Sequence, residues 1–132
     1  MNVVDSSAWL SYFAADANAS RFAKPIENLP QLLVPSITLT EVFKHVCRHR
    51  DEESALAVVA HMEQGTVIDL DSELAISAAA YGVTLHIPLA DSIIFATARK
   101  YNAKLWTQDA DFKELPGVRF YPRKPWSDPA DS

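Results

Sequence analysis

Four acidic residues recur at similar places along the sequence. Asp5 and Asp109 each follow a short apolar segment, and Glu41 and Asp91 each lie near the start of a segment with helical periodicity. Carboxylate oxygens are hard ligands, the kind that Mg²⁺ and Mn²⁺ prefer over sulfur. If the fold brings these side chains together, they form a site for a divalent cation.

The segments around these residues alternate between two patterns. Apolar or β-branched runs predict strands over residues 2–4, 32–35, 66–70, 104–107 and 118–121. Apolar residues at helical spacing predict helices over residues 7–13, 20–29, 38–50, 51–64, 72–81, 89–101 and 110–115, with Gly82 ending the fifth. Strands separated by helices predict a three-layer α/β domain with a central parallel sheet of about five strands. Because ligands bind at the carboxyl edge of such sheets, we expect the four carboxylates to converge there.

Each acidic residue also has a purely structural explanation. Asp5 can cap the helix that follows it, and residues 38–41 (Thr-Leu-Thr-Glu) match a capping box. Asp91 can interact with its helix dipole, and Asp109 stands in an ordinary turn context. A second acidic run, residues 69–73, is interpreted as a strand end followed by a helix N-cap. Four such residues at equivalent places are harder to attribute to capping than any one alone.

Composition limits the classes of function. The chain has 132 residues, the size of a single domain. It carries 12 Lys and Arg against 17 Asp and Glu, a net charge of −5. A protein that coats duplex nucleic acid by charge would usually be basic, so this balance argues against that role. It does not argue against an enzyme that gathers carboxylates around metal ions, because bound cations reverse the local sign.

Targeting signals are also missing from the sequence pattern. No apolar run approaches the ~18 residues of a membrane helix, and the N-terminus lacks the basic and apolar regions of a secretory signal. The single cysteine, Cys47, cannot form an intrachain disulfide, which fits a reducing compartment. We therefore expect a cytoplasmic protein without membrane contact. Its domain is expected over residues 1–121, and the proline-containing residues 122–132 are expected to form an irregular tail.

Four sequence segments resemble those of a known family. They are residues 3–7 (Val-Val-Asp-Ser-Ser), 39–42 (Leu-Thr-Glu-Val), 88–98 (Pro-Leu-Ala-Asp-Ser-Ile-Ile-Phe-Ala-Thr-Ala) and 105–112 (Leu-Trp-Thr-Gln-Asp-Ala-Asp-Phe). In order and spacing they resemble the signature segments of PIN-domain ribonucleases, and more narrowly those of VapC-type toxins of bacterial toxin–antitoxin pairs. The resemblance spans nearly the whole chain. It departs slightly at Ser92, where the family often has a small apolar residue.

The resemblance implies an endoribonuclease that depends on Mg²⁺ or Mn²⁺. It carries over Asp5, Glu41, Asp91 and Asp109 as the catalytic acidic residues. Our hypothesis is that Asp5, Asp91 and Asp109 hold the metal, whereas Glu41 orients or deprotonates the attacking water. Carboxylates crowded in this way repel one another, so the pKa of some should rise without metal.

Further residues are expected to support this site. Ser7 and Thr107 are interpreted as hydroxyls that fix the orientation of a carboxylate. Asp111 matches an acidic position that the family uses less consistently. Lys44 and Arg48 share one helical face, which either contacts RNA phosphates or is an ordinary solvated surface.

The family resemblance also implies partners. It implies a homodimer and a short VapB-type antitoxin that places a basic side chain in the acidic site. DNA would be contacted only through that antitoxin. Two alternatives remain: a catalytically inactive PIN-like binding module, and a phosphoryl-transfer α/β domain such as a receiver or a haloacid-dehalogenase-like phosphatase. The latter needs an acidic pair or Asp-x-Asp at the first strand, where this chain has Asp5 followed by two serines.

Overall fold

The computed structural model describes residues 1–123, and within them strands and helices alternate. The strands are β1 (Asn2–Val4), β2 (Leu32–Pro35), β3 (Thr66–Ile68), β4 (Lys104–Thr107) and β5 (Val118–Phe120). The helices are α1 (Ser6–Ala14), α2 (Ala19–Glu27), α3 (Ser36–His49), α4 (Glu52–Met62), α5 (Ser72–Leu85) and α6 (Leu89–Lys100), with 3₁₀ turns η1 (Leu29–Gln31) and η2 (Ala110–Phe112). β1, β2 and β4 have the bounds predicted from the sequence.

All five strands run parallel in one sheet, in the order β3-β2-β1-β4-β5. β1 is central, because Val3 pairs with Leu33 of β2 on one side and with Leu105 of β4 on the other. Short, uniformly apolar strands are typical of a sheet that is covered on both faces. The predicted three-layer α/β domain with a five-stranded parallel sheet is confirmed.

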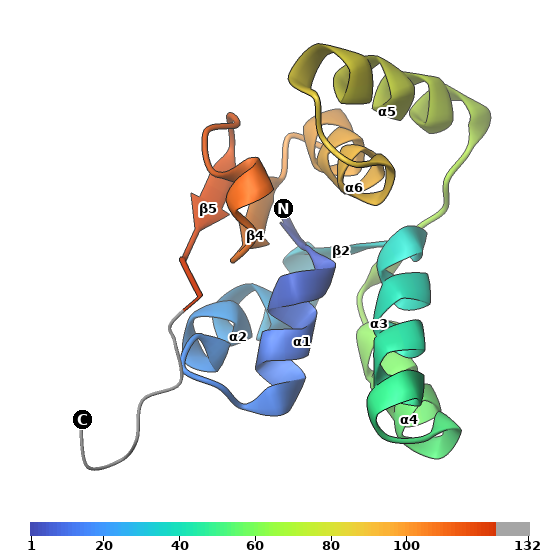
Figure 1. The fold of residues 1–132 in the computed structure, drawn as a ribbon, viewed down its shortest axis with the longest axis vertical. Coiled ribbons are helices and arrows are strands. Elements are labelled where there is room, and N and C mark those ends of the chain that lie inside the picture. The colour runs from blue at the N-terminus through green and yellow to red at the C-terminus, as the bar shows by residue number, and fades with distance from the viewer. Residues whose placement is uncertain (124–132) are drawn as a thin grey trace.

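Successive residues of β1 point to opposite faces of the sheet and so divide the core into two sides. Val4 packs in a cluster with Trp9 of α1 and with buried residues of α2, α3 and α4. Val3 packs in a second cluster with Phe95 of α6. Helices α1 to α4 therefore cover one face, and α6 covers the other with α5 packed against it (Figure 1).

The start of α3 differs from the prediction. The helix begins at Ser36 rather than Thr38, with Pro35 as its N-cap. The hydroxyl of Thr38 donates a hydrogen bond to the carbonyl oxygen of Pro35 at 2.7 Å, so it does not cap the helix. Glu41 consequently lies in the second turn, and the predicted capping box is wrong.

The end of α5 also differs from the prediction. The helix continues through Gly82 to Leu85 and ends at His86, whose φ of 56° is left-handed. A glycine inside a helix costs only about 1 kcal/mol relative to alanine. That cost is too small to stop a helix whose Leu74 and Ala78 are buried against α6. Gly82 is therefore an interior residue and not a terminator.

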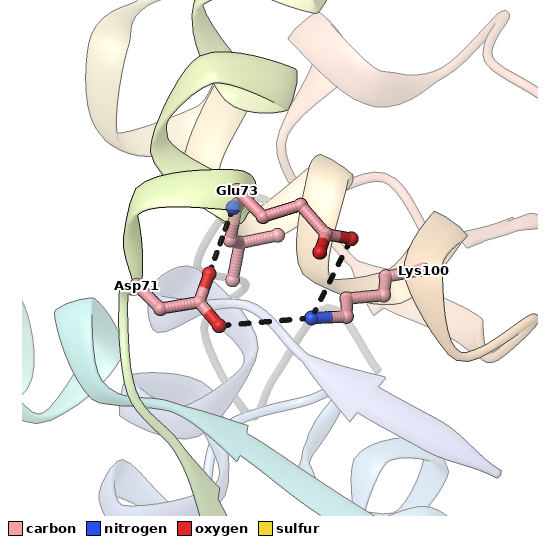
Figure 2. Close-up of polar contacts among 4 residues, drawn as sticks. Asp71, Glu73 and Lys100 are labelled. Carbon is pink, nitrogen blue, oxygen red and sulfur yellow. Dashed lines mark hydrogen bonds and ion pairs between the residues drawn. The ribbon is translucent and has the colours of Figure 1, made fainter.

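The second acidic run has the structural role predicted for it. Asp71 is the N-cap of α5, and its Oδ1 accepts a hydrogen bond from the backbone N–H of Leu74 at 2.8 Å. The ammonium group of Lys100 lies 3.8 Å from Asp71 Oδ2 and 3.9 Å from Glu73 Oε1 (Figure 2). These carboxylates thus join the start of α5 to the end of α6.

The helices and the C-terminal segment bear on the predictions about a membrane span and an irregular tail. Among residues 1–123 no single helix is long and apolar enough to cross a bilayer, although α5 and α6 reach that length and composition as a pair bent by 114°. After β5, the backbone N–H of Tyr121 still donates to the carbonyl oxygen of Thr107 at 2.9 Å. Of the predicted irregular tail 122–132, residues 124–132 lie outside the described part of the chain.

Candidate active site

The predicted acidic residues gather at the carboxyl edge of the sheet. Asp5 directly follows the central strand β1, and Asp109 comes two residues after the neighbouring strand β4. Asp91 lies in the first turn of α6, and Glu41 lies in the second turn of α3. The charges of Asp109, Asp5 and Glu41 all act on Asp91, so the four carboxylates share one region.

Asp5 is held rigidly in this site. Its side chain is only 2% exposed, and its Oδ1 accepts from the backbone N–H of Ala8 at 2.9 Å as the N-cap of α1. The hydroxyl of Ser7 donates to both carboxylate oxygens at 2.8 and 3.0 Å, and that of Thr107 donates to Oδ2 at 2.7 Å. Burial raises the pKa of Asp5 from 3.8 to about 6, although these hydrogen bonds oppose the rise. Ser7 and Thr107 thus orient the Asp5 carboxylate, and their support of a metal site stays a prediction.

A chain of hydrogen bonds orders the acidic loop after β4. Thr107 is fully buried, and its hydroxyl oxygen accepts from the backbone N–H of Asp109 at 2.8 Å. Asp109 Oδ1 in turn accepts from the backbone N–H of Asp111 at 2.9 Å and caps η2. The same threonine thereby orients both Asp5 and the loop that carries the other carboxylates.

Three carboxylates are close enough to share a cation. One oxygen each of Asp91, Asp109 and Asp111 lies within 4.8 Å of the others, the only such acidic group among residues 1–123. Burial, together with the nearby charges of Asp109, Asp5, Glu41 and Asp111, raises the pKa of Asp91 to about 7. An all-oxygen donor set of this kind fits Mg²⁺ or Mn²⁺. The structure groups Asp111, rather than Asp5, with the other two at this spacing, so ligation by Asp5 stays a prediction.

Glu41 is positioned by a residue that sequence reasoning missed. The hydroxyl of Ser6 donates to Glu41 Oε1 at 2.6 Å, which ties α1 to α3 across 35 positions of sequence. In the sequence, the only feature that draws attention to Ser6 is that it follows Asp5. Nothing in the local sequence indicates which distant residue its hydroxyl reaches.

Gln108 is a second residue that the sequence did not single out. Its side-chain amide donates to the carbonyl oxygen of Ser7 at 3.2 Å, and its backbone N–H donates to the Ser7 hydroxyl at 3.4 Å. Its side-chain oxygen accepts from the amide of Asn18 at 3.1 Å. Gln108 therefore braces the serine that holds Asp5.

The two basic candidates lie outside this network. Lys44 and Arg48 are exposed residues of α3, the helix that also carries Glu41. Among the described residues the ion pairs are those of Lys100, so neither candidate pairs with the carboxylates there. Their contact with RNA phosphates stays a prediction.

A family model shows which family the chain belongs to. The model for the PIN domain matches residues 3–118, a range that contains every acidic residue described above. The chain belongs to the PIN domain family. The resemblance noted in the four sequence segments is confirmed at the level of the family. The catalytic roles predicted for the individual carboxylates stay predictions.

Solved structures share this PIN fold. A toxin–antitoxin complex from Klebsiella pneumoniae contains a chain 22% identical to this one, with a TM-score of 0.78 and coverage of 93% of this chain and 100% of that chain. VapC20 of Mycobacterium tuberculosis, described as a sarcin–ricin loop cleaving toxin, is 21% identical, with a TM-score of 0.74 and coverage of 95% and 100%. DNA-bound VapBC from Salmonella typhimurium contains a chain that is 20% identical, with a TM-score of 0.71 and coverage of 92% of this chain and 98% of that chain. A comparison with curated proteins found no match.

Proposed function

We propose that the protein is a Mg²⁺- or Mn²⁺-dependent endoribonuclease that acts as the toxin of a VapBC-type pair. The observation that carries the proposal is the carboxylate group of Asp91, Asp109 and Asp111, with Asp5 beside it at the sheet edge. Membership of the PIN family supports nuclease activity. Structural likeness to VapC20, which is described as cleaving an RNA loop, supports RNA as the substrate.

The surroundings of each carboxylate suggest its role in the reaction. Asp91, Asp109 and Asp111 would hold the metal, with Asp5 as a further ligand or as a charge behind them. A bound divalent ion supplies activation of the attacking water and neutralisation of the leaving oxygen. Glu41, fixed by the hydroxyl of Ser6, would orient or deprotonate that water.

The hydroxyls beside Asp5 would keep this arrangement preorganised. Ser7 and Thr107 donate to its two oxygens and leave the buried carboxylate little freedom to rotate. Outer contacts of this kind typically change metal affinity or activity by about 10- to 100-fold when they are removed. Lys44 and Arg48, exposed on α3, would contact RNA phosphates.

The proposal extends to partners. The structures similar to this chain include toxin–antitoxin complexes and DNA-bound VapBC, which supports a VapB-type antitoxin and contact with DNA only through it. A basic side chain of that antitoxin would pair with the crowded carboxylates. A homodimer is supported by exposed apolar side chains on α5 and at the start of α6, since Ile76, Val83 and Leu89 are each more than 70% exposed. We place this assembly in the cytoplasm.

The decisive experiment is cleavage of a total small-RNA pool by purified protein with Mg²⁺ or Mn²⁺. Asp91→Asn and a chelator should each abolish discrete fragments, because both remove the metal from the site. Glu73→Gln is the matched control, since it neutralises a carboxylate whose ion pair joins α5 to α6. Fragments that persist in Asp91→Asn or in chelator would contradict the proposed site.

A further inference from the structure

A cavity of about 400 Å³ lies beside the acidic site. Residues of α1, α3 and α4 form its walls, and Gln108 from the loop after β4 closes one side. Ser7 lines the cavity and also donates its hydroxyl to Asp5. Because Ser7 lies in the first turn of α1 and Ala14 ends the helix, the cavity extends roughly 10 Å along the helix from the Asp5 end.

We propose that this cavity binds the nucleoside next to the cleaved phosphate of the RNA. The inference rests on the proposed function and adds a subsite to it. The cavity is linked to the carboxylates in two ways, since Ser7 lines it and donates to Asp5, and Gln108 lines it and directly precedes Asp109 in the chain. The volume falls in the range of about 300–1,000 Å³ that is usual for small-molecule sites.

The apolar part of the lining suits a base. The side chains of Leu10, Phe13, Val46 and Val58 offer an apolar surface on which any of the four bases can pack, and the ring of Phe13 can stack on the base. The ring of Phe13 stacks on that of Trp9, with ring centroids 5.8 Å apart at an interplanar angle of 15°.

The charges at the cavity favour RNA as its occupant. The chain as a whole carries −5, yet Arg50 and Arg123 both line this one cavity, and its described lining includes one carboxylate, that of Asp16. Within residues 1–123 neither arginine has a carboxylate within ion-pair distance. Two arginines against one carboxylate leave this lining locally positive, which complements a polyanion.

The test measures binding without cleavage. The background is Asp91→Asn, and the probe is a short fluorescently labelled single-stranded RNA followed by anisotropy. Val58→Trp fills the cavity, whereas Leu56→Trp, on the exposed face of the same helix at 56% exposure, is its matched control. Arg50→Glu removes a cation of the lining, and Lys24→Glu on α2 makes the same change of charge elsewhere.

We expect Val58→Trp and Arg50→Glu each to weaken RNA binding about tenfold or more, and both controls to stay within about twofold of the background. If Val58→Trp does not fold, the Arg50→Glu and Lys24→Glu pair decides the question alone. Equal binding within both pairs overturns the subsite. So does a Val58→Trp protein that binds RNA normally but no longer retains a co-expressed antitoxin, because the cavity then holds protein.

A separate measurement distinguishes failure of the subsite from failure of the proposed function. Protein with an intact Asp91 is tested for RNA cleavage and for a thermal shift with Mn²⁺. If it cleaves RNA and Val58→Trp retains full binding, only the subsite fails. If it neither cleaves RNA nor responds to Mn²⁺, the proposed function fails and the subsite fails with it.

Discussion

Asp5 performs two tasks that its sequence context presented as alternatives. It caps α1 through the N–H of Ala8, and it lies among the carboxylates of the candidate site. The two tasks support each other, because the capping bond and the hydroxyls of Ser7 and Thr107 fix one rotamer of a buried carboxylate. Assigning a residue to a cap therefore does not remove it from consideration as a catalytic residue.

Gln108 provides a test of this preorganisation at the residue scale. Gln108→Leu keeps the approximate volume but removes the donor to the Ser7 carbonyl and the acceptor for Asn18. We expect a stability loss of about 1–2 kcal/mol and a Mn²⁺ affinity lower by about tenfold. Thermal unfolding and calorimetric titration with Mn²⁺ measure the two effects.

Asn2→Ala separates a local effect from general destabilisation. It removes the hydrogen bond from the Trp106 indole to Asn2 Oδ1, 2.9 Å long, at the start of β1 and away from the carboxylates. It should cost a similar stability and leave Mn²⁺ affinity unchanged. Equal Mn²⁺ affinity in Gln108→Leu and Asn2→Ala would show that Gln108 is merely structural.

At the scale of elements, two glycines differ in how much space surrounds them. A Cβ added at Gly82, inside α5, would lie 3.5 Å from the Cβ and hydroxyl oxygen of Ser92, which is ordinary contact. A Cβ added at Gly65, between α4 and β3, would lie 2.9 Å from Val34 Cγ2 and 3.0 Å from Leu32 side-chain atoms. Only Gly65 is required by close packing.

Alanine substitution should therefore have opposite effects at these two sites. Gly82→Ala should raise the free energy of unfolding by about 0.5–1 kcal/mol, because it lowers the entropy of the unfolded chain and favours the helix. Gly65→Ala should lower it, because buried side chains in β2 must move. Denaturant unfolding of both variants measures the pair, and a destabilised Gly82→Ala would mean that α5 and α6 are closer than described.

The elements also explain which features the sequence could predict. The gathering of Asp5, Asp91 and Asp109 follows from topology, since parallel strands and their crossover helices place these positions at one edge. The contact of Ser6 with Glu41 could not be predicted, because it depends on how α1 and α3 pack. The place of Asp111 beside Asp91 likewise depends on side-chain directions in η2, which no periodicity encodes.

For the molecule as a whole, the carboxylate cluster is a source of instability that a bound cation relieves. Asp5 and Asp91 have pKa values raised to about 6 and about 7, so the metal-free fold favours their protonated forms. A raised acidic pKa stabilises the fold fully below the unfolded value of 3.8. That stabilisation is lost as the pH rises from 3.8 to the folded pKa, which is about 6 for Asp5 and about 7 for Asp91. For buried Asp5 the loss is on the order of 3 kcal/mol.

The metal-free protein should consequently melt at a lower temperature at pH 8 than at pH 5.5, and Mn²⁺ should restore more stability at pH 8. Asp91→Asn removes one titrating group and its repulsion, so in chelator at pH 8 it should melt higher than the wild type and respond little to Mn²⁺. The difference between the two proteins isolates the carboxylate from histidines that titrate in the same range. Thermal unfolding at both pH values, with chelator and with Mn²⁺, provides the comparison. A wild type that is equally stable at both pH values without metal would mean that solvent screens these charges, and the cluster would then cost the fold nothing.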